Sequence, residues 1–443
     1  MKKLPLWREL CYSSGSFSGG IVGTAFGSWL MFFYIDTLHF NAGAIGVSMV
    51  IYAIWNAIND PLMGYISDRT RSRWGRRIPY VLFGTIPLMV AFFLVFSPPM
   101  DLLQSSLSQI LYFTLSICIY DTFFTTVLLN WTSVVPEMYP QERDRNRLLG
   151  ISQVFGIVGA MVGTVAVEPL VKAFGWSAMA AIFAVVGVIT MLIAVFGMRE
   201  DPNNRVPEAI KLVDSFKYTL KSKSFLLCVF SVLFVESART MLLAALPFYA
   251  DYVLGQDFAY TILIAAILLA AIVLTPLVVF ISNKKGAKHA YIFSLMVFTA
   301  GCFLFFFSPN LTSCIVIGVL MGFGVTGAIT MPNVLLGQVI DEDQTVTGLR
   351  REGAYFGINA LIMRLSVAFQ SVAMTAILTF TGYDSSSSHQ SATVVTGIKS
   401  LMSFVPAVFI LIALAFAYFY PLYGNRLIEV RSKIEQFMQA SEK

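Results

Sequence analysis

Long apolar segments alternate with short polar ones along the whole chain. Twelve of these segments are each about 20 residues or longer, the length at which a helix crosses the hydrocarbon core of a bilayer. The expected spans are residues 14–36, 42–66, 78–98, 107–133, 147–172, 176–198, 224–251, 257–281, 289–308, 311–338, 351–381 and 395–420. The pattern therefore predicts an all-α integral membrane protein with twelve transmembrane helices.

A long polar segment near the middle of the chain divides the spans into six and six. It carries apolar residues at helical spacing, which fits either an amphipathic helix on the membrane surface or a solvated linker helix. A basic loop with a turn glycine follows the second span at Gly75 and recurs after the eighth at Gly286, which indicates a duplicated six-helix unit. The expected organisation is an N-terminal bundle at 1–198, a linker at 199–223, a C-terminal bundle at 224–420 and a tail at 421–443.

Composition and charge agree with a membrane protein and predict its orientation. Hydrophobic residues make up 57% of the 443 residues and charged residues only 12%, whereas soluble domains have about 25% charged residues. Most of the 30 Lys and Arg residues fall in loops of one side, and the opposite side has Lys172 and Lys399. The positive-inside rule therefore places both termini, the linker and the tail in the cytoplasm, with the chain in the plasma membrane. The net charge of +5 follows from this bias and needs no nucleic-acid partner.

Sequence signatures of enzymes are missing. No phosphate-binding Gly-x-x-x-x-Gly-Lys loop occurs, His39, His289 and His389 are isolated, and the five cysteines form no close pair. We therefore expect a protein that is not an enzyme and that uses no cofactor. Its expected partners are the bilayer and a small-molecule solute, and we expect it to be a monomer.

Five charged residues fall inside expected spans. They are Asp60, Asp121, Glu236, Arg239 and Arg364. A charge at the bilayer centre costs roughly 2.5–3.5 kcal/mol, so such residues usually face a cavity, a partner or an ion path. Glu236 and Arg239 stand three residues apart on one helix and can pair. They fit either a structural ion pair or a substrate-binding role.

The segment from Asn59 to Arg77 carries the most informative pattern. It reads Asn-Asp-Pro-x-x-Gly-x-x-x-Asp-x-Thr-x-Ser-Arg-Trp-Gly-Arg-Arg, and further motifs lie at 30–36, 135–137 and 348–353. In these motifs the chain resembles the major facilitator superfamily, and within it the glycoside-pentoside-hexuronide cation symporters, which are melibiose permease-like. The resemblance implies the major facilitator fold and cation-coupled symport of a sugar or glycoside by alternating access.

The resemblance also implies a cation site on the second span. In the family, this span has two carboxylates one turn apart and a nearby Asn. Asp60 and Asn59 match the second carboxylate and the Asn, but Asn56 stands where the first carboxylate is expected. Asp60, amide oxygens of Asn56 and Asn59, and the hydroxyl of Thr125 are the expected ligands for Na⁺, which prefers hard oxygen ligands. A lone, partly desolvated carboxylate suits H⁺ at least as well, because burial raises its pKa, and we place H⁺ slightly ahead of Na⁺. The alternative is that Asp60 only hydrogen-bonds the backbone near Pro61.

Further residues are expected to bind the solute. Arg364 matches a lysine that the family places beside its sugar and ion sites, and it could neutralise Asp60 or Asp121 or bind an anionic group. Trp131 lies near the family's sugar-stacking tryptophan, although an interfacial position explains it equally. Gln153 stands where the family has an arginine. Asp121, which has no family counterpart, joins this group with Glu236 and Arg239.

The family's two sugar-binding carboxylates fall at Gly20 and Leu128 of this chain. Their loss keeps a second function open, the transport of an amphipathic or lysolipid-like solute. At the cytoplasmic end of the second span a gate is expected from Asp68, Arg73, Arg76 and Arg77, which could latch neighbouring helices together. The alternative is a solvated charge cluster that only determines topology.

Overall fold

A computed structural model describes residues 5–138, 142–200, 219–256, 258–347, 352–385, 387 and 390–441. Its elements are α1 (Leu6–Phe32), η1 (Phe33–Thr37), α2 (Ala42–Arg69), α3 (Ile78–Phe96), η2 (Met100–Leu102), α4 (Ser106–Ser133), α5 (Val135–Met138), α6 (Glu142–Val165), α7 (Val167–Phe174), α8 (Trp176–Gly197), α10 (Lys223–Tyr249), η3 (Ala250–Leu254), α11 (Ala259–Lys285), α12 (Ala287–Phe306), α13 (Leu311–Thr347), α14 (Glu352–Thr381), α15 (Ala392–Met402), α16 (Phe404–Phe419) and α17 (Gly424–Ser441). Of the expected linker at 199–223, residues 201–218 lie outside the described residues.

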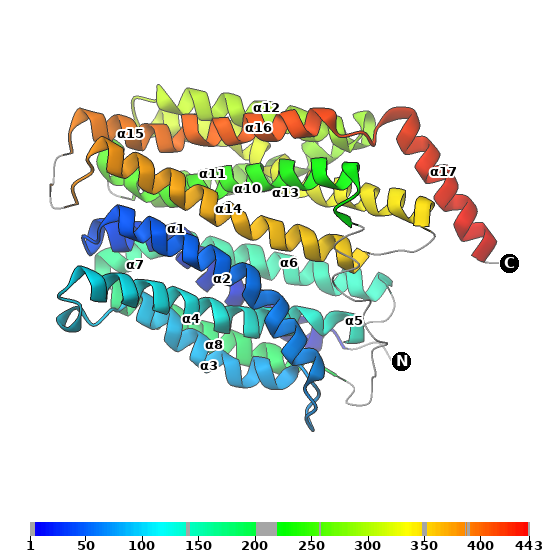
Figure 1. Cartoon of the computed structure of the whole chain (residues 1–443), viewed down its shortest axis with the longest axis horizontal. Coiled ribbons are helices and arrows are strands. Elements are labelled where there is room, and N and C mark those ends of the chain that lie inside the picture. Colours follow the sequence, from blue (N-terminus) through cyan, green and yellow to red (C-terminus); the bar gives the residue numbers. More distant parts are fainter. Residues whose placement is uncertain are drawn as a thin grey trace.

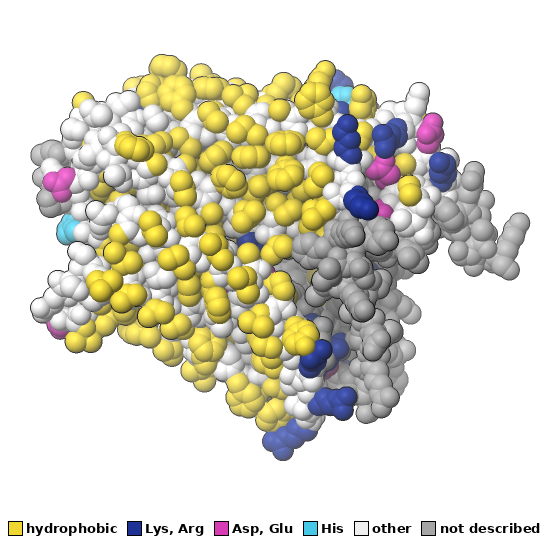
Figure 2. Space-filling model, in the orientation of Figure 1, with side chains coloured by type: hydrophobic (Ala, Val, Ile, Leu, Met, Phe, Trp, Pro, Cys, Tyr) yellow, Lys and Arg dark blue, Asp and Glu magenta, His cyan; other side chains and the backbone are white. Residues whose placement is uncertain are grey.

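Twelve helical segments among the described residues are long and apolar enough to cross a membrane. Six precede the central segment and six follow it, and the long helices run lengthwise with both termini at one end (Figure 1). This confirms the all-α, twelve-span fold. Figure 2 shows apolar side chains along the length of the molecule and Lys and Arg gathered where the termini lie. We call this the basic end, after Arg69, Arg73 and Arg426, and the other, which carries His39 and Tyr383, the opposite end.

Two of the expected spans are interrupted by a break in the helix. The expected span 147–172 divides into α6 and α7 at Ala166, and the last span divides into α15 and α16 at Ser403. Each break comes three residues before a proline, Pro169 and Pro406. Proline has no backbone N–H to donate and its ring clashes with the carbonyl one turn back, so the preceding helix ends. Apolar composition on both sides hides these breaks from a hydropathy pattern.

The tenth span extends beyond its expected end at residue 338, because α13 continues to Thr347. The added residues include Asp341, Glu342 and Asp343. Because they are charged, the apolar pattern ends before them, although the helix continues through them. Glu342 pairs with Arg426 of α17 at 2.6 Å. The projecting turns of α13 therefore hold the C-terminal helix.

Helices α1 and α6 pack backbone against backbone. A side chain at Gly20 of α1 would lie 2.7 Å from the carbonyl oxygen of Gly156 and 2.9 Å from the amide of Ala160 on α6. On α6, a side chain at Gly159 or Gly163 would lie closer still, 2.3 and 2.2 Å from backbone carbonyl oxygens of α1. Small residues permit this approach, which is how membrane helices gain packing energy without a hydrophobic driving force. The contact leaves no space between these helices for a solute.

Candidate functional site

Polar residues of α2 and α4 meet near the middle of their spans. Tyr52, Asn56 and Asn59 recur at one face of α2 and all donate hydrogen bonds to the Asp121 carboxylate of α4. The distances are 3.4 Å from the Tyr52 hydroxyl and 3.0 Å from Asn59 Nδ2, which also donates to the Asp121 carbonyl at 3.0 Å. Asp121 is 1% exposed. A carboxylate so deeply buried requires such donors, because its desolvation is otherwise too costly.

Asp60 lies next to this cluster and connects the two halves of the protein. Thr125 of α4 donates to Asp60 Oδ1 at 2.7 Å, and Arg364 of α14 pairs with Oδ2 at 2.5 Å. The side chains of Asp60 and Arg364 are 25% and 33% exposed. Charged surface at this depth cannot face lipid cheaply, so it faces the interior between the halves.

The structure thus brings together six of the residues that the sequence singled out. The four expected cation-site residues lie in one cluster with Asp121 and Arg364. Tyr52 belongs to the same cluster and was not predicted. It stands one turn before Asn56 on the same face of α2, so helical periodicity extended from Asn59 is the signal that would have found it.

Glu236 and Arg239 form a two-pronged ion pair on α10. Arg239 Nε donates to Glu236 Oε2 at 2.9 Å, and its Nη2 contacts the other carboxylate oxygen. The two side chains are 29% and 35% exposed in the middle of an apolar span. This fork of donors satisfies the carboxylate, and part of both groups stays exposed.

Trp131 lies in the contact between α4 and α1. Its ring stacks on Tyr12 with centroids 4.7 Å apart, and each residue donates a side-chain hydrogen bond to the backbone carbonyl of the other. Both side chains are buried, whereas Gln153 is exposed on α6. Gly20 and Leu128, where the family has carboxylates, also lie in helix contacts: Gly20 against α6 and Leu128 against Gly19.

At the basic end a carboxylate organises the loop that holds the expected gate. Glu200, just after α8, accepts hydrogen bonds from the backbone N–H of Arg77 at 2.9 Å and of Ile78 at 3.3 Å, and Arg76 Nε lies 3.5 Å away. Arg73 lies over the Trp74 ring at 4.5 Å. The side chain of Asp68 falls outside the described part of the structure. These contacts attach the loop to the segment after α8 in the same half. Glu200 was not predicted, because it lies at the start of a linker that is polar overall.

The opposite end is closed by polar contacts between the halves. Asp36 of η1 accepts hydrogen bonds from the hydroxyls of Tyr252 and Tyr383, which lie 3.2 Å from each other. Burial, and then the Asp36 carboxylate beside it, raise the pKa of Tyr383, so its phenol keeps its proton and remains a donor. Glu168 of α7 binds Thr261 of α11 across the same interface.

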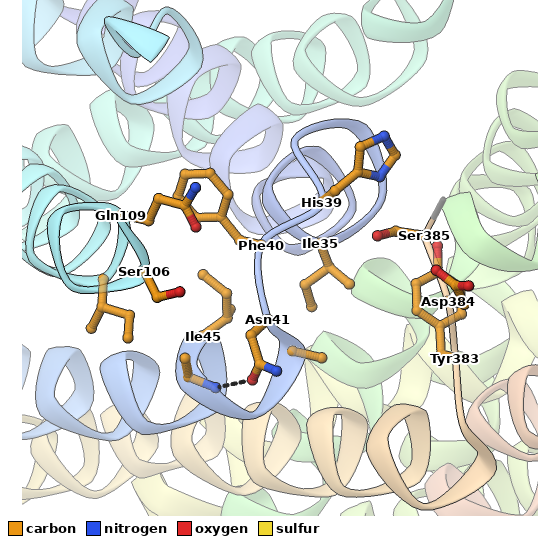
Figure 3. A pocket seen from close by; sticks show the side chains of 13 residues that line it. Ile35, His39, Phe40, Asn41, Ile45, Ser106, Gln109, Tyr383, Asp384 and Ser385 are labelled. Carbon is orange, nitrogen blue, oxygen red and sulfur yellow. Dashed lines mark hydrogen bonds between the residues drawn. The ribbon is translucent and has the colours of Figure 1, made fainter. Parts of the chain in front are cut away.

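Two cavities of about 340 Å³ each lie beside these contacts. Figure 3 shows the first, where Tyr383 and Asp384 face the turn that leads into α2; there Asn41 accepts a hydrogen bond from the Ala44 amide at 3.0 Å. The second is lined by aromatic and charged side chains of both halves, including Trp29, Tyr260 and Asp251. Both cavities belong to the opposite end and are separate from the Asp60 cluster.

A bundle of twelve spans in two halves, joined at mid-span by a charged pair, is the architecture of a secondary transporter. The crystal structure of the nucleoside transporter NupG superimposes with a TM-score of 0.69 at 13% identity, covering 94% of this chain and 100% of that one. A family model described as MFS/sugar transport protein matches residues 11–424. The chain belongs to this family.

Curated relatives cover nearly the full chain at low identity. The inner membrane symporter YicJ of Escherichia coli is 23% identical over 98% of this chain and 95% of its own length. The glucuronide carrier protein homolog of the same organism is 24% identical over 97% of each chain. The similarity is therefore of whole proteins and not of a shared segment.

Proposed function

We propose that the protein is a symporter that couples the movement of a monovalent cation to that of a sugar- or glycoside-type solute by alternating access. The observation that carries this proposal is the pair between Asp60 and Arg364. It lies at mid-span, is partly exposed to the interior, and joins α2 of one half to α14 of the other. Family membership and the names of the relatives support the solute class.

The pair suits coupling because its charge balance changes when a cation binds. A cation at Asp60 competes with Arg364 for the carboxylate, so binding weakens the contact between α2 and α14. Arg364 is then free to bind a hydroxyl or an anionic group of the solute, for which its planar fork of donors is well suited. In this mechanism the halves exchange conformation when both ligands are bound or both are absent.

The contacts of the opposite end support an assignment of the conformation. Asp36 with its two tyrosines, and Glu168 with Thr261, close the path between the halves there. With the basic end in the cytoplasm, as the positive-inside rule predicts, the closed end faces the outside of the cell, and these contacts support an inward-facing state. Passage to the outward-open state requires both sets of contacts to separate.

Downhill solute uptake tests the proposal. Proteoliposomes are loaded with buffer, and a panel of glycosides, pentoses, hexuronides and one lysophospholipid is added outside. Solute uptake and external pH are both recorded, in NaCl and in choline chloride. Alkalinisation with a sugar supports H⁺ symport, and uptake that requires NaCl without a pH change supports Na⁺ symport. Both signals should vanish in Asp60→Asn. Movement of the lysophospholipid alone contradicts the proposed solute class.

A further inference from the structure

The coupling site departs from its family pattern at Asn56, where a carboxylate is expected. We propose that Asp121 of α4 supplies the missing second carboxylate, so that the cation site is divided between two helices. This inference rests on the proposed function, since it assigns a residue to the coupling site. It also moves Asp121 from the solute-binding group, where the sequence had placed it, to the cation site.

Geometry places the Asp121 carboxylate where it can substitute for an acid at position 56. Asn56 Nδ2 donates directly to Asp121 Oδ1, and Asn59 Nδ2 donates to Oδ2 at 3.0 Å. The carboxylate therefore lies one hydrogen bond from the side chain that the family pattern makes acidic. An acid brought from α4 can thus serve the same space as an acid carried on α2.

Asp121 and Asp60 also belong to one connected unit. Asn59 binds Asp121 and is adjacent to Asp60 in α2, and Thr125, one turn after Asp121 in α4, binds Asp60 at 2.7 Å. These two contacts both join α2 to α4, and each includes one carboxylate. A cation bound between them can be held by both acids, by the Thr125 hydroxyl and, after rotation of the amides, by the oxygens of Asn56 and Asn59.

The balance of charge argues for a cation at this place. Asp60 is paired with Arg364, whereas the partners that the described residues give the Asp121 carboxylate are a phenol and two amides, all neutral. Two carboxylates and one guanidinium leave one net negative charge in the cluster. A buried charge without a counter-charge is costly, so one monovalent cation is the ligand that the cluster favours.

Accessibility distinguishes a cation ligand from a solute ligand. Asp121 is 1% exposed and lies behind Tyr52 and the two amides, while the Asp60 side chain is 25% exposed. A sugar can reach Asp121 only by displacing those side chains. A proton or Na⁺ is small enough to reach the carboxylate by rotation of those side chains alone, which is what a coupling site requires.

Cation binding to the purified protein, with no solute present, tests this assignment. NaCl is titrated calorimetrically into wild type, Asp121→Asn, the double variant Asn56→Asp/Asp121→Asn and Asp101→Asn, an exposed acid of η2 that serves as the matched control. We expect Asp121→Asn to weaken Na⁺ binding about a hundredfold, because a buried charge partner is removed. The double variant returns the carboxylate to α2 and should regain most of the affinity.

If wild type binds no Na⁺, the same four proteins are compared by the rise in melting temperature on mild acidification, which reports H⁺ binding. Asp121→Asn should lose this rise, and the double variant should regain it. Equal cation binding in wild type and Asp121→Asn would overturn the assignment, as would a double variant that stays as weak as Asp121→Asn although it folds. Failure of every solute in the uptake panel would instead contradict the proposed function, because these measurements use no solute.

Discussion

Glu168 of α7 caps the first turn of α11, which belongs to the other half of the protein. Its Oε2 accepts hydrogen bonds from the backbone N–H of Thr261 at 3.0 Å and from the Thr261 hydroxyl at 2.9 Å. The first N–H groups of a helix have no partner within the helix, and the helix dipole favours a negative charge there. The Glu168 carboxylate thus connects the two halves at the opposite end by accepting a hydrogen bond from a free backbone N–H at the start of α11.

We expect Glu168→Gln to loosen the opposite end. The amide of Gln keeps one acceptor but loses the charge that the helix dipole favours, so the halves should separate more often. Hydrogen exchange of the Thr261 amide measures this directly, and it should accelerate about tenfold, in line with replacing a charge-assisted hydrogen bond by a neutral one. Thr261→Val, which removes only the hydroxyl, should have a smaller effect. Unchanged exchange in Glu168→Gln would show that this contact does not hold the end closed.

Removal of Arg364 should harm the protein more than removal of both members of its pair. Arg364→Gln leaves the Asp60 carboxylate without its counter-charge, and because the pair is partly exposed we expect a loss of about 1–3 kcal/mol in the free energy of unfolding. The double variant Asp60→Asn/Arg364→Gln leaves neither member of this pair charged without its partner, and it should recover most of this loss. Thermal unfolding of the purified proteins gives the comparison. A double variant less stable than Arg364→Gln would contradict a direct pair.

Glu200 should stabilise the basic end beyond the value of a surface ion pair. Its carboxylate is buried and accepts from backbone N–H groups at the start of α3, so Glu200→Gln should cost about 1–2 kcal/mol of stability, as loss of a helix cap does. Glu342→Gln is the matched control, because its partner Arg426 is 55% exposed and such pairs contribute about 0–1 kcal/mol. Equal melting temperatures for the two variants would reject the capping role.

Glycine-to-alanine substitutions at two positions of α6 should have opposite effects on stability. Gly159→Ala would force a methyl group into the backbone of Phe17 on α1, so it should lower stability or yield of folded protein. Gly150→Ala on the same helix meets open space and should be neutral, or stabilising by about 0.5–1 kcal/mol, since Ala is the better helix former. Detergent-solubilised yield and melting temperature report both effects. A destabilised Gly150→Ala would show that backbone flexibility matters more than packing.

The number and type of spans could be predicted from the chain because hydropathy depends only on local composition. The interruptions at Ala166 and Ser403 could not, since apolar residues continue through both breaks and only a proline three residues later marks them. The extension of α13 was missed for the opposite reason: Asp341 and its neighbours are helical but polar. Hydropathy therefore predicts which residues cross the membrane, but not where each helix begins and ends.

The membership of the mid-span cluster was partly predictable and its pairings were not. Asp60, Asp121 and Arg364 could be identified because charged residues are rare inside membrane spans. The sequence did not determine which of the two acids Arg364 would pair with. The structure pairs it with Asp60, because α14 packs against α2 there. That Asn56 and Asn59 contact Asp121 depends on the rotation of α4 relative to α2, which no pattern within either helix encodes.

The close approach at Gly20 has a consequence for any attempt to retarget this protein. Introducing at this position the carboxylate that the family resemblance implies would put its Cβ 2.7 Å from the Gly156 carbonyl oxygen. No substitution in α6 can make room, because the obstructing atoms are backbone and the residue is already glycine. Any change of sugar preference that uses this position requires the two helices to move apart. The main-chain packing of α1 against α6 therefore limits what a single substitution can do here.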